Sequence, residues 1–435
     1  MSTSRSAFYL KKQKISLDFY AQNTSSDGGF LLLHKLMRKT KIINSFSKVL
    51  HDNRDQRYVD FSLEQMIQTR VLLLAMGYED ANDLSYLRED PVLQSLLPEG
   101  VCSQSTMSRL ENGFRMSELY ELGLWWINRY VQSLPAGKEY VILDVDCTDD
   151  PTHGNQQGSL FHGYYWQWML NELFYIDGET GQVILPVLRP GNVHSGKWNH
   201  RFLRAIVEAL RTRFPNLQIV IRADAGFSGP DFYSLVEELE LDFCLGVASN
   251  DRLKEVVRPL HDKIEEEYAR HNKPFKTFMG PFSYQADSWP CPQDLYAKVE
   301  STGKGMNVRF FASNFADEKP LELYRDFYTQ RGEAAENRIK EIKNMCFSDR
   351  LSCHRFSANF FRLMLSCLAY ELLRMIREQI QTLKHPVAQR WSVQSIRLYL
   401  LKVAAQVRVR VKAIHYSFSS AFAQQELFWQ ILQRC

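Results

Sequence analysis

The stretch VILDVDCTDDPTHG, residues 141–154, decides the fold expected for this chain. Its first residues have the pattern of a buried β-strand, and four aspartates fall within seven residues, at positions 144, 146, 149 and 150. Two carboxylates held about 4 Å apart repel each other by roughly 4 kcal/mol at an effective dielectric near 20. A bound cation or a basic side chain is therefore expected where this strand ends.

The segments that follow indicate an α/β sheet. Residues 160–169 and 173–191 predict further strands, the latter folding back at the DGETG turn as a hairpin. A helix over 195–214, a strand over 217–224, a helix starting near Pro230 and a strand over 241–248 come next. Strands that pair antiparallel, followed by alternating helices and strands, are typical of an α/β sheet. Trp166 and Trp168 are expected to pack the second strand.

Three aspartate and glutamate positions are expected to converge at one sheet edge. Asp144 and Asp146 share a face of their strand, because side chains repeat every two residues. Asp224 ends another strand, where α/β sheets bind ligands, although it could simply cap the following turn. A third acid is expected from YTQRGEAAENRIKEIK, residues 328–343, whose helical spacing gathers Glu333, Glu336, Lys340 and Lys343 in one sector. The alternative is a solvated helix with ion pairs.

Two other segments suggest a polyanionic partner. In GVCSQSTMSRLENGF, residues 100–114, the side chains of Gln104, Ser105 and Arg109 suit a helix that touches phosphates and base edges. In VRVRVKAI, residues 407–414, one face of a strand carries Arg408, Arg410 and Lys412. The alternatives are a solvated polar helix and an edge strand protected by charge.

Composition fits a globular protein of two or three domains. The chain has 435 residues, 45% hydrophobic and 24% charged, with a net charge of +3. No apolar run is long enough to span a bilayer, and the N-terminal residues lack the pattern of a signal peptide, so a cytoplasmic location is expected. The eight cysteines include no C-x-x-C pair, which argues against zinc knuckles and a disulfide framework.

Taken together, several motifs resemble those of bacterial insertion-sequence transposases of the DDE superfamily, most closely the thirteen-eighty family. The resemblance covers nearly the whole chain and is carried by SQSTMSRLEN, LDVDCTDDPTHGNQQ, FHGYYWQWM, DGETG, LRPGNVHSG, IRADAGF, YTQRGEAAENRIKEIK and DRLSCHRFSANFFRL. It implies a ribonuclease-H-like catalytic core over residues 137–250 and 321–385, interrupted by an inserted β region over 251–320. A helical DNA-binding domain over 1–136 and a C-terminal region over 386–435 would flank this core.

The resemblance also implies a set of site residues. Asp146, Asp224 and Glu336 would hold two Mg²⁺ ions, with Mn²⁺ as a substitute; Asp144 and Glu333 are the alternatives to the first and last. The wider group carries a Tyr-x2-Arg-x3-Glu-x6-Lys signature, which here would be Tyr328, Arg331, Glu336 and Lys343. Four residues instead of three separate Arg331 from Glu336 in this chain. Tyr328, Arg331, Lys340 and Lys343 are expected to contact DNA.

The implied activity is DNA transposition. Such an enzyme binds the terminal inverted repeats of its element, cleaves the DNA and joins the 3′-hydroxyl ends to target DNA by two-metal phosphoryl transfer. It would act as a homodimer on double-stranded DNA, associated with the nucleoid. The alternatives are a metal-dependent nuclease without strand transfer and a DNA-binding regulator with an inactive site. In the inserted region, Trp289 is expected either to stack on an extruded base or to pack a small β core.

Overall fold

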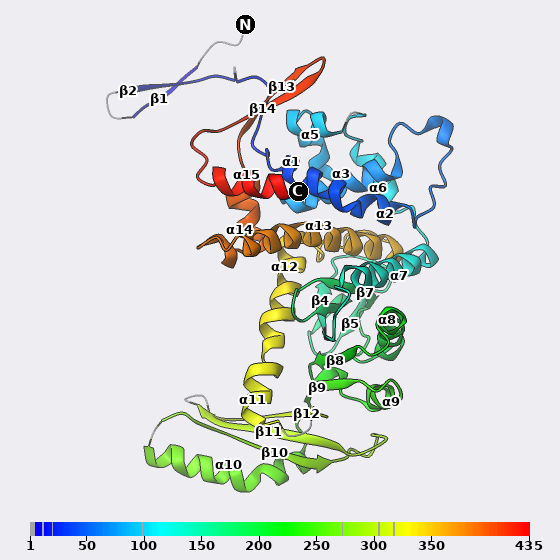
Figure 1. Cartoon of the computed structure of the whole chain (residues 1–435), viewed down its shortest axis with the longest axis vertical. Helices are drawn as coiled ribbons and strands as arrows, with labels where there is room; N and C mark the ends of the chain where they lie inside the picture. The colour runs from blue at the N-terminus through cyan, green and yellow to red at the C-terminus, as the bar shows by residue number, and fades with distance from the viewer. Residues whose placement is uncertain are drawn as a thin grey trace. The chain divides into compact units, whose positions relative to one another are not determined.

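The computed structural model describes residues 5–10, 13–19, 21–97, 99–271, 273–302, 305–315 and 318–435. The chain forms two compact units, one from residues 1–110 and 368–435 and the other from residues 111–367 (Figure 1). Helix α13 (Phe356–Thr382) contributes residues to both units. In the described part of the chain, no helix is both long and apolar enough to cross a lipid bilayer.

The unit of residues 111–367 is built on a mixed sheet of nine strands. β6 pairs antiparallel with β4 and β7, and β8 pairs parallel with β4 and β9, so three antiparallel strands adjoin two parallel ones. The strands are β4 (Tyr140–Pro151), β5 (Leu160–His162), β6 (Gln167–Asp177), β7 (Val183–Pro190), β8 (Gln218–Ala223), β9 (Asp242–Val247), β10 (Phe275–Tyr284), β11 (Gln293–Thr302) and β12 (Gly305–Ser313).

Helices cover both faces of this sheet. Figure 1 shows α8 and α9 on one side and the helical segment that ends in α12 on the other. Covering both faces explains why the middle of β6, from Leu173 to Ile176, is fully buried on both sides. The helices of the unit are α7 (Met116–Ser133), α8 (Asn199–Arg213), α9 (Pro230–Glu238), α10 (Asp251–His271), α11 (Pro320–Glu322) and α12 (Asn337–Cys346).

The region between β9 and α11 differs in part from the expected β region. β10, β11 and β12 are present, and β12 pairs antiparallel with β9, so they extend the central sheet. Residues 251–271, however, form α10, where only β structure was expected. The sequence of α10 gives a weak helical signal, because Pro259 lies inside the helix and its buried side chains are those of Leu253, Val257 and Ile264.

The unit of residues 1–110 and 368–435 is mainly helical. Ser62 caps α3 by accepting a hydrogen bond from the backbone of Gln65, and Gly77 ends the helix in the left-handed conformation. The elements are α1 (Phe30–Thr40), α2 (Ile42–Ser47), α3 (Leu63–Met76), α4 (Leu84–Leu87), α5 (Pro91–Leu96), α6 (Gln104–Glu111), α14 (Val393–Ile396), α15 (Gln425–Arg434), β1 (Arg5–Leu10), β2 (Gln13–Leu17), β3 (Thr24–Ser25), β13 (Ala405–Arg410) and β14 (Ala413–Phe418).

Candidate active site

Asp146 and Asp224 lie side by side where the pairing of β4 with β8 ends, although β4 itself continues to Pro151, beyond the strand end expected from the sequence. The parallel register of β4 and β8 pairs Val145 with Ala223, and Asp146 and Asp224 are the next residues on each strand. Neighbouring strands lie about 4.8 Å apart, so the two residues lie close together. Asp224 also caps the turn that follows, because its Oδ1 accepts a hydrogen bond of 2.9 Å from the backbone of Gly226. Both roles considered for Asp224 are therefore compatible.

Arg331 ties the first aspartate to the third predicted acid. One guanidinium nitrogen donates to Asp146 Oδ2 at 2.8 Å, and another donates to Glu336 Oε1 at 3.1 Å. The side chains of Asp146 and Arg331 are 13% and 12% exposed, whereas that of Glu336 is 45% exposed. Burial raises the pKa of Asp146 to about 6; Arg331 opposes this shift, and the charges of Asp224 and Glu336 add to it.

A π-helical turn accounts for the unusual spacing between Arg331 and Glu336. The helical segment from Pro320 to Cys346 contains two π stretches, Leu323–Tyr328 and Gly332–Glu336. A π turn forms hydrogen bonds from residue i to i+5, so residues five apart lie on the same face. The additional residue is thereby absorbed, and Arg331 and Glu336 still meet. The side chain of the alternative acid, Glu333, lies outside the described residues.

Asp144, the alternative first acid, has a different environment. It is completely buried and forms a two-pronged ion pair with Arg222 at 2.7 and 2.8 Å. Arg222 in turn donates to the backbone oxygen of Phe327. Arg222 is not among the site residues expected from the sequence, although a charged residue inside the buried strand that pairs with Asp144 was the available signal. Asp144 thus holds β4, β8 and the helical segment together.

The other residues of the predicted signature lie along the same helical segment. The Lys343 amine bonds to Asp149 Oδ1 at 3.0 Å and to Thr148 Oγ1 at 3.4 Å, which ties α12 to β4. Tyr328 stacks on Phe311 with the ring planes 12° apart, so much of its surface is used in packing. Lys340 is exposed.

A second group of acids lies farther along β4. Asp150 and Glu172 are 1% and 0% exposed, and three of their four carboxylate oxygens have no hydrogen-bond partner among the described residues. The fourth, Glu172 Oε2, accepts from Ser348 at 2.8 Å. Burial raises the pKa of both carboxyls, and for Asp150 the charge of Glu172 adds to the effect. Sequence analysis expected Asp150 near the site but did not single out Glu172.

The residues around Asp146 fit a divalent metal in their chemistry. Carboxylate oxygens are the ligands that Mg²⁺ prefers, and the three acids outnumber the one cation, Arg331, that touches Asp146 and Glu336. Their oxygens are not as tightly gathered as those of His261, Asp262 and Glu265, which alone among the described side chains form a group within 4.8 Å. That trio lies on α10, and Asp262 and Glu265 are largely exposed, as expected for a solvated helix face.

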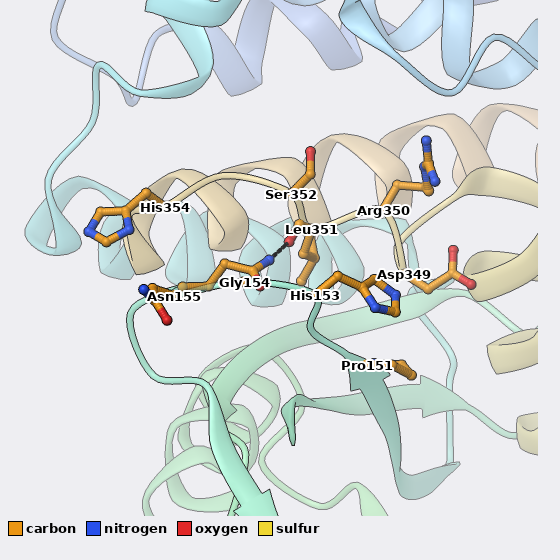
Figure 2. Close-up of a pocket in the computed structure, with 10 residues that line it drawn as sticks. Pro151, His153, Gly154, Asn155, Asp349, Arg350, Leu351, Ser352 and His354 are labelled. Atoms are coloured by element: carbon orange, nitrogen blue, oxygen red, sulfur yellow. Dashed lines mark hydrogen bonds between the residues drawn. The ribbon is translucent and has the colours of Figure 1, made fainter. Parts of the chain in front are cut away.

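A polar pocket of about 390 Å³ adjoins the end of β4 (Figure 2). Two of the sequence motifs face each other across it, residues 151–156 and residues 349–354. The side chain of Gln156 donates a hydrogen bond to the backbone oxygen of Leu351, which links the two loops. The ionisable residues that line the pocket are His153, Asp349, Arg350 and His354. Both basic and acidic groups therefore surround the pocket.

The remaining predicted DNA-binding residues belong to the other unit. In α6, Gln104, Ser105 and Arg109 are exposed, and Ser103 bonds to the backbone of Thr106 as a cap. Arg408 and Arg410 are exposed on β13, but Lys412 lies in the turn before β14 instead of on the strand. The basic face expected over residues 407–414 is thus shorter than predicted.

Two expectations about tryptophans have clear outcomes. Trp289 is 9% exposed and packs on Tyr233 and Tyr284, at ring distances of 4.6 and 5.6 Å, so the packing alternative is confirmed. The expectation that Trp166 and Trp168 pack the second strand is wrong, because they are 80% and 59% exposed.

Comparison with family models agrees with the broader part of the resemblance, the DDE transposases. A family model described as Transposase DDE domain group 1 matches residues 8–435. No curated protein matches the chain. Among solved structures, it is similar to a chain of the cryo-EM structure of a piggyBac transposase synaptic complex with hairpin DNA. The two share 12% identity over 85% of this chain and 78% of the other, with a TM-score of 0.46.

Proposed function

This chain belongs to the DDE transposase family, and on that premise we propose that it excises and inserts a bacterial insertion sequence of the thirteen-eighty family. Family membership makes it a DNA transposase enzyme and implies dependence on a divalent metal. In the proposal, it binds the terminal inverted repeats, cleaves the DNA and joins the 3′-hydroxyl ends to target DNA. It acts as a homodimer on double-stranded DNA, in association with the nucleoid.

The proposed catalytic core is ribonuclease-H-like. Three antiparallel strands, β7, β6 and β4, followed by the parallel strands β8 and β9, support it, because their register brings Asp146 and Asp224 next to each other. The core spans residues 137–250 and 321–385 in this proposal, with residues 251–320 inserted. Residues 1–136 bind DNA, and residues 386–435 form a C-terminal region.

Asp146, Asp224 and Glu336 are the proposed metal ligands. The bound metal, as two Mg²⁺ ions or Mn²⁺ in their place, would activate water or a 3′-hydroxyl and stabilise the departing oxygen in an in-line displacement. The ion pair of Asp144 with Arg222 favours Asp146 as the first ligand, because Asp144 has both oxygens occupied.

The basic residues of the helical segment have separate proposed roles. Arg331 compensates the charge of Asp146 and Glu336 before DNA and metal arrive, and its planar fork then suits a phosphate. Lys343 holds β4 through Asp149 and adds positive charge beside the scissile phosphate, where Tyr328 also contacts DNA. Lys340, which is exposed, contacts the DNA backbone farther from the cleaved bond. Gln104, Ser105 and Arg109, together with Arg408, Arg410 and Lys412, contact the element ends.

One observation carries this proposal above the others. Arg331, 185 residues after Asp146, bonds to it and to Glu336, while the register of β4 and β8 places Asp224 beside it. Two acids, from a strand and a helix, therefore bond to a single cation, and the third follows the neighbouring strand beside them. A regulator that had lost its catalytic site would have no need to keep this arrangement.

The test uses DNA carrying the inverted repeats that flank the reading frame. Asp146→Asn, Asp224→Asn and Glu336→Gln should each abolish cleavage while leaving binding to the repeats nearly unchanged; Asp60→Asn, at an exposed position, should retain both. With supercoiled target plasmid, joined products support a transposase, and hydrolysis alone indicates a nuclease. Full cleavage by the Glu336 variant would move the third ligand to Glu333.

A further inference from the structure

The hairpin between β5 and β6 presents an unusual cluster of exposed rings. Phe161, Tyr164, Tyr165, Trp166 and Trp168 are 40%, 86%, 38%, 80% and 59% exposed. We refer to residues 160–168 as the aromatic hairpin. It contains no charged residue. Exposed apolar patches on soluble proteins mark interaction sites, so a partner with flat, apolar surfaces is required.

The rings are arranged on the two faces of the hairpin. Phe161 pairs with Trp168 across the strands, and its ring lies 5.3 Å from Trp166 and 6.1 Å from Trp168 in edge-to-face contacts. On the other face, Tyr165 contacts His162 and Tyr164, each at 5.1 Å. Edge-to-face packing leaves ring faces open to a further stacking partner.

The aromatic hairpin is anchored next to the candidate active site. Gln167, at the start of β6, donates to Asp149 Oδ2 at 2.7 Å, and Lys343 bonds to the other oxygen of Asp149. The side chain of Asp149 thus connects the aromatic hairpin to α12. Burial, followed by the nearby Cys147, Asp149 and Asp146, raises the pKa of Tyr165 to about 12. Tyr165 therefore lies within electrostatic reach of the proposed ligand Asp146.

The absence of charge distinguishes between candidate partners. A DNA duplex presents phosphates on its outside, and the aromatic hairpin has no cation to receive them. Unpaired bases present π faces, which stack on aromatic side chains whatever the base sequence. Gln167 of the hairpin bonds to Asp149, which is three residues after the proposed ligand Asp146 on β4, so unpaired bases of a strand held at that site would lie within reach of these rings.

We propose that the aromatic hairpin receives unpaired bases of the DNA strand at the cleavage site, stacked on Trp166, Trp168 and Tyr164. The inference rests on the proposed function for its setting beside the cut strand. Trp289, for which stacking on an extruded base was considered, is enclosed by Tyr233 and Tyr284. The proposal therefore assigns base stacking to the tryptophans of the aromatic hairpin. Trp166 is held for this role by a turn in which its backbone N–H donates to His162 at 2.8 Å.

The test measures binding in EDTA, so it does not depend on which residues cleave. The probes are a blunt duplex carrying the element end and the same duplex with the terminal bases of one strand unpaired. Trp166→Ala and Trp168→Ala should each weaken binding to the unpaired end by about five- to a hundredfold. Binding to the blunt duplex should stay within about twofold, since phosphate contacts are unaffected.

Two controls separate stacking from other effects. Trp166→Phe keeps a ring and should retain most of the affinity for the unpaired end. Trp429→Ala removes a tryptophan of similar exposure, 52%, from α15 and should change neither affinity. A fluorescent adenine analogue among the unpaired bases should be quenched by the wild type and less so by the alanine variants.

Three results would overturn the proposal. The first is equal loss of affinity for blunt and unpaired ends in Trp166→Ala and Trp168→Ala. The second is no preference of the wild type for the unpaired end. The third is a change from dimer to monomer in sedimentation with unchanged DNA preference, which would assign the aromatic hairpin to a second copy of the chain. Retained cleavage in the Asp146→Asn and Asp224→Asn variants would instead count against the proposed function.

Discussion

Arg331 donates a hydrogen bond of 2.8 Å to Asp146, although 185 residues separate them in the chain. The same guanidinium reaches Glu336, and its side chain is almost buried. In the metal-free protein it is the cation in contact with both carboxylates among the described residues, and it compensates charges that a metal would otherwise compensate. Replacing it should therefore affect both stability and metal binding.

Arg331→Ala should destabilise the metal-free protein by about 3 kcal/mol, because it leaves the buried Asp146 carboxylate without its partner. Added Mg²⁺ should then raise the unfolding temperature more than in the wild type, since the metal restores the missing positive charge. Urea unfolding in EDTA and thermal unfolding with Mg²⁺ measure the two effects. Arg325→Ala, at a 61% exposed position of the same segment, is the matched control. Equal Mg²⁺ responses in wild type and Arg331→Ala would contradict the prediction.

Asp144→Asn and Asp146→Asn should differ in their effect on the free energy of unfolding. Asp144→Asn breaks a completely buried ion pair with Arg222 and should cost about 3 kcal/mol or more. Asp146→Asn should change stability by less than about 1 kcal/mol, because burial already disfavours its charge. Urea midpoints in EDTA measure both. A stable, inactive Asp144→Asn protein would transfer the metal-ligand role to Asp144.

The buried acids beyond the site should make stability depend on pH. Burial and the charge of Glu172 raise the pKa of Asp150, so the folded state keeps a proton that the unfolded state releases. This proton favours folding below the ordinary aspartate range, and its contribution is lost as the pH rises. Asp150→Asn should remove a decline of up to about 1.4 kcal/mol per pH unit between about pH 6 and pH 9. Urea unfolding across that range, with Asp60→Asn as control, measures it; parallel curves would count against the prediction.

Binding to the element ends should depend steeply on salt. Each phosphate contact contributes a slope of about 0.9 in the logarithm of affinity against the logarithm of salt concentration. Lys340 is exposed on α12, so Lys340→Ala should reduce the slope by about that amount. Lys340→Arg keeps the charge and should keep the slope. Fluorescence anisotropy over a salt series gives both values, and an unchanged slope in Lys340→Ala would exclude Lys340 from the interface.

Much of the strand and helix pattern follows from local sequence. In α3, Ser62 and Gly77 are residue types that favour a helix start and a helix stop, and they occupy those positions. The hairpin of β6 and β7 and the strand that ends before Asp224 are where the sequence predicts them. In each case a short stretch contains both the apolar period and the residue that begins or ends the element.

Other features depend on contacts that local sequence does not specify. α10 has few buried side chains and an internal proline, so its pattern resembles a solvated segment. Trp168 lies on β6, but Trp166 lies in the turn before it with a φ of 54°, and both are exposed, although their spacing in the sequence resembles that of buried residues of one strand. The π turn at Gly332–Glu336 could not be predicted locally, because an additional residue in a helix has no single local outcome. Its position depends on the distant residue Asp146, to which Arg331 bonds.

The surplus residue in that π turn has a mechanical consequence. An α turn advances by about 100° per residue, so tightening Gly332–Glu336 into α geometry would twist the two halves of the helical segment against each other by roughly that angle. Arg331 would swing off Glu336 without any loss of chain continuity. The additional residue therefore allows this helical segment to rotate about its axis between π and α geometry. In the α geometry, Arg331 would no longer cover the carboxylate oxygens of Glu336.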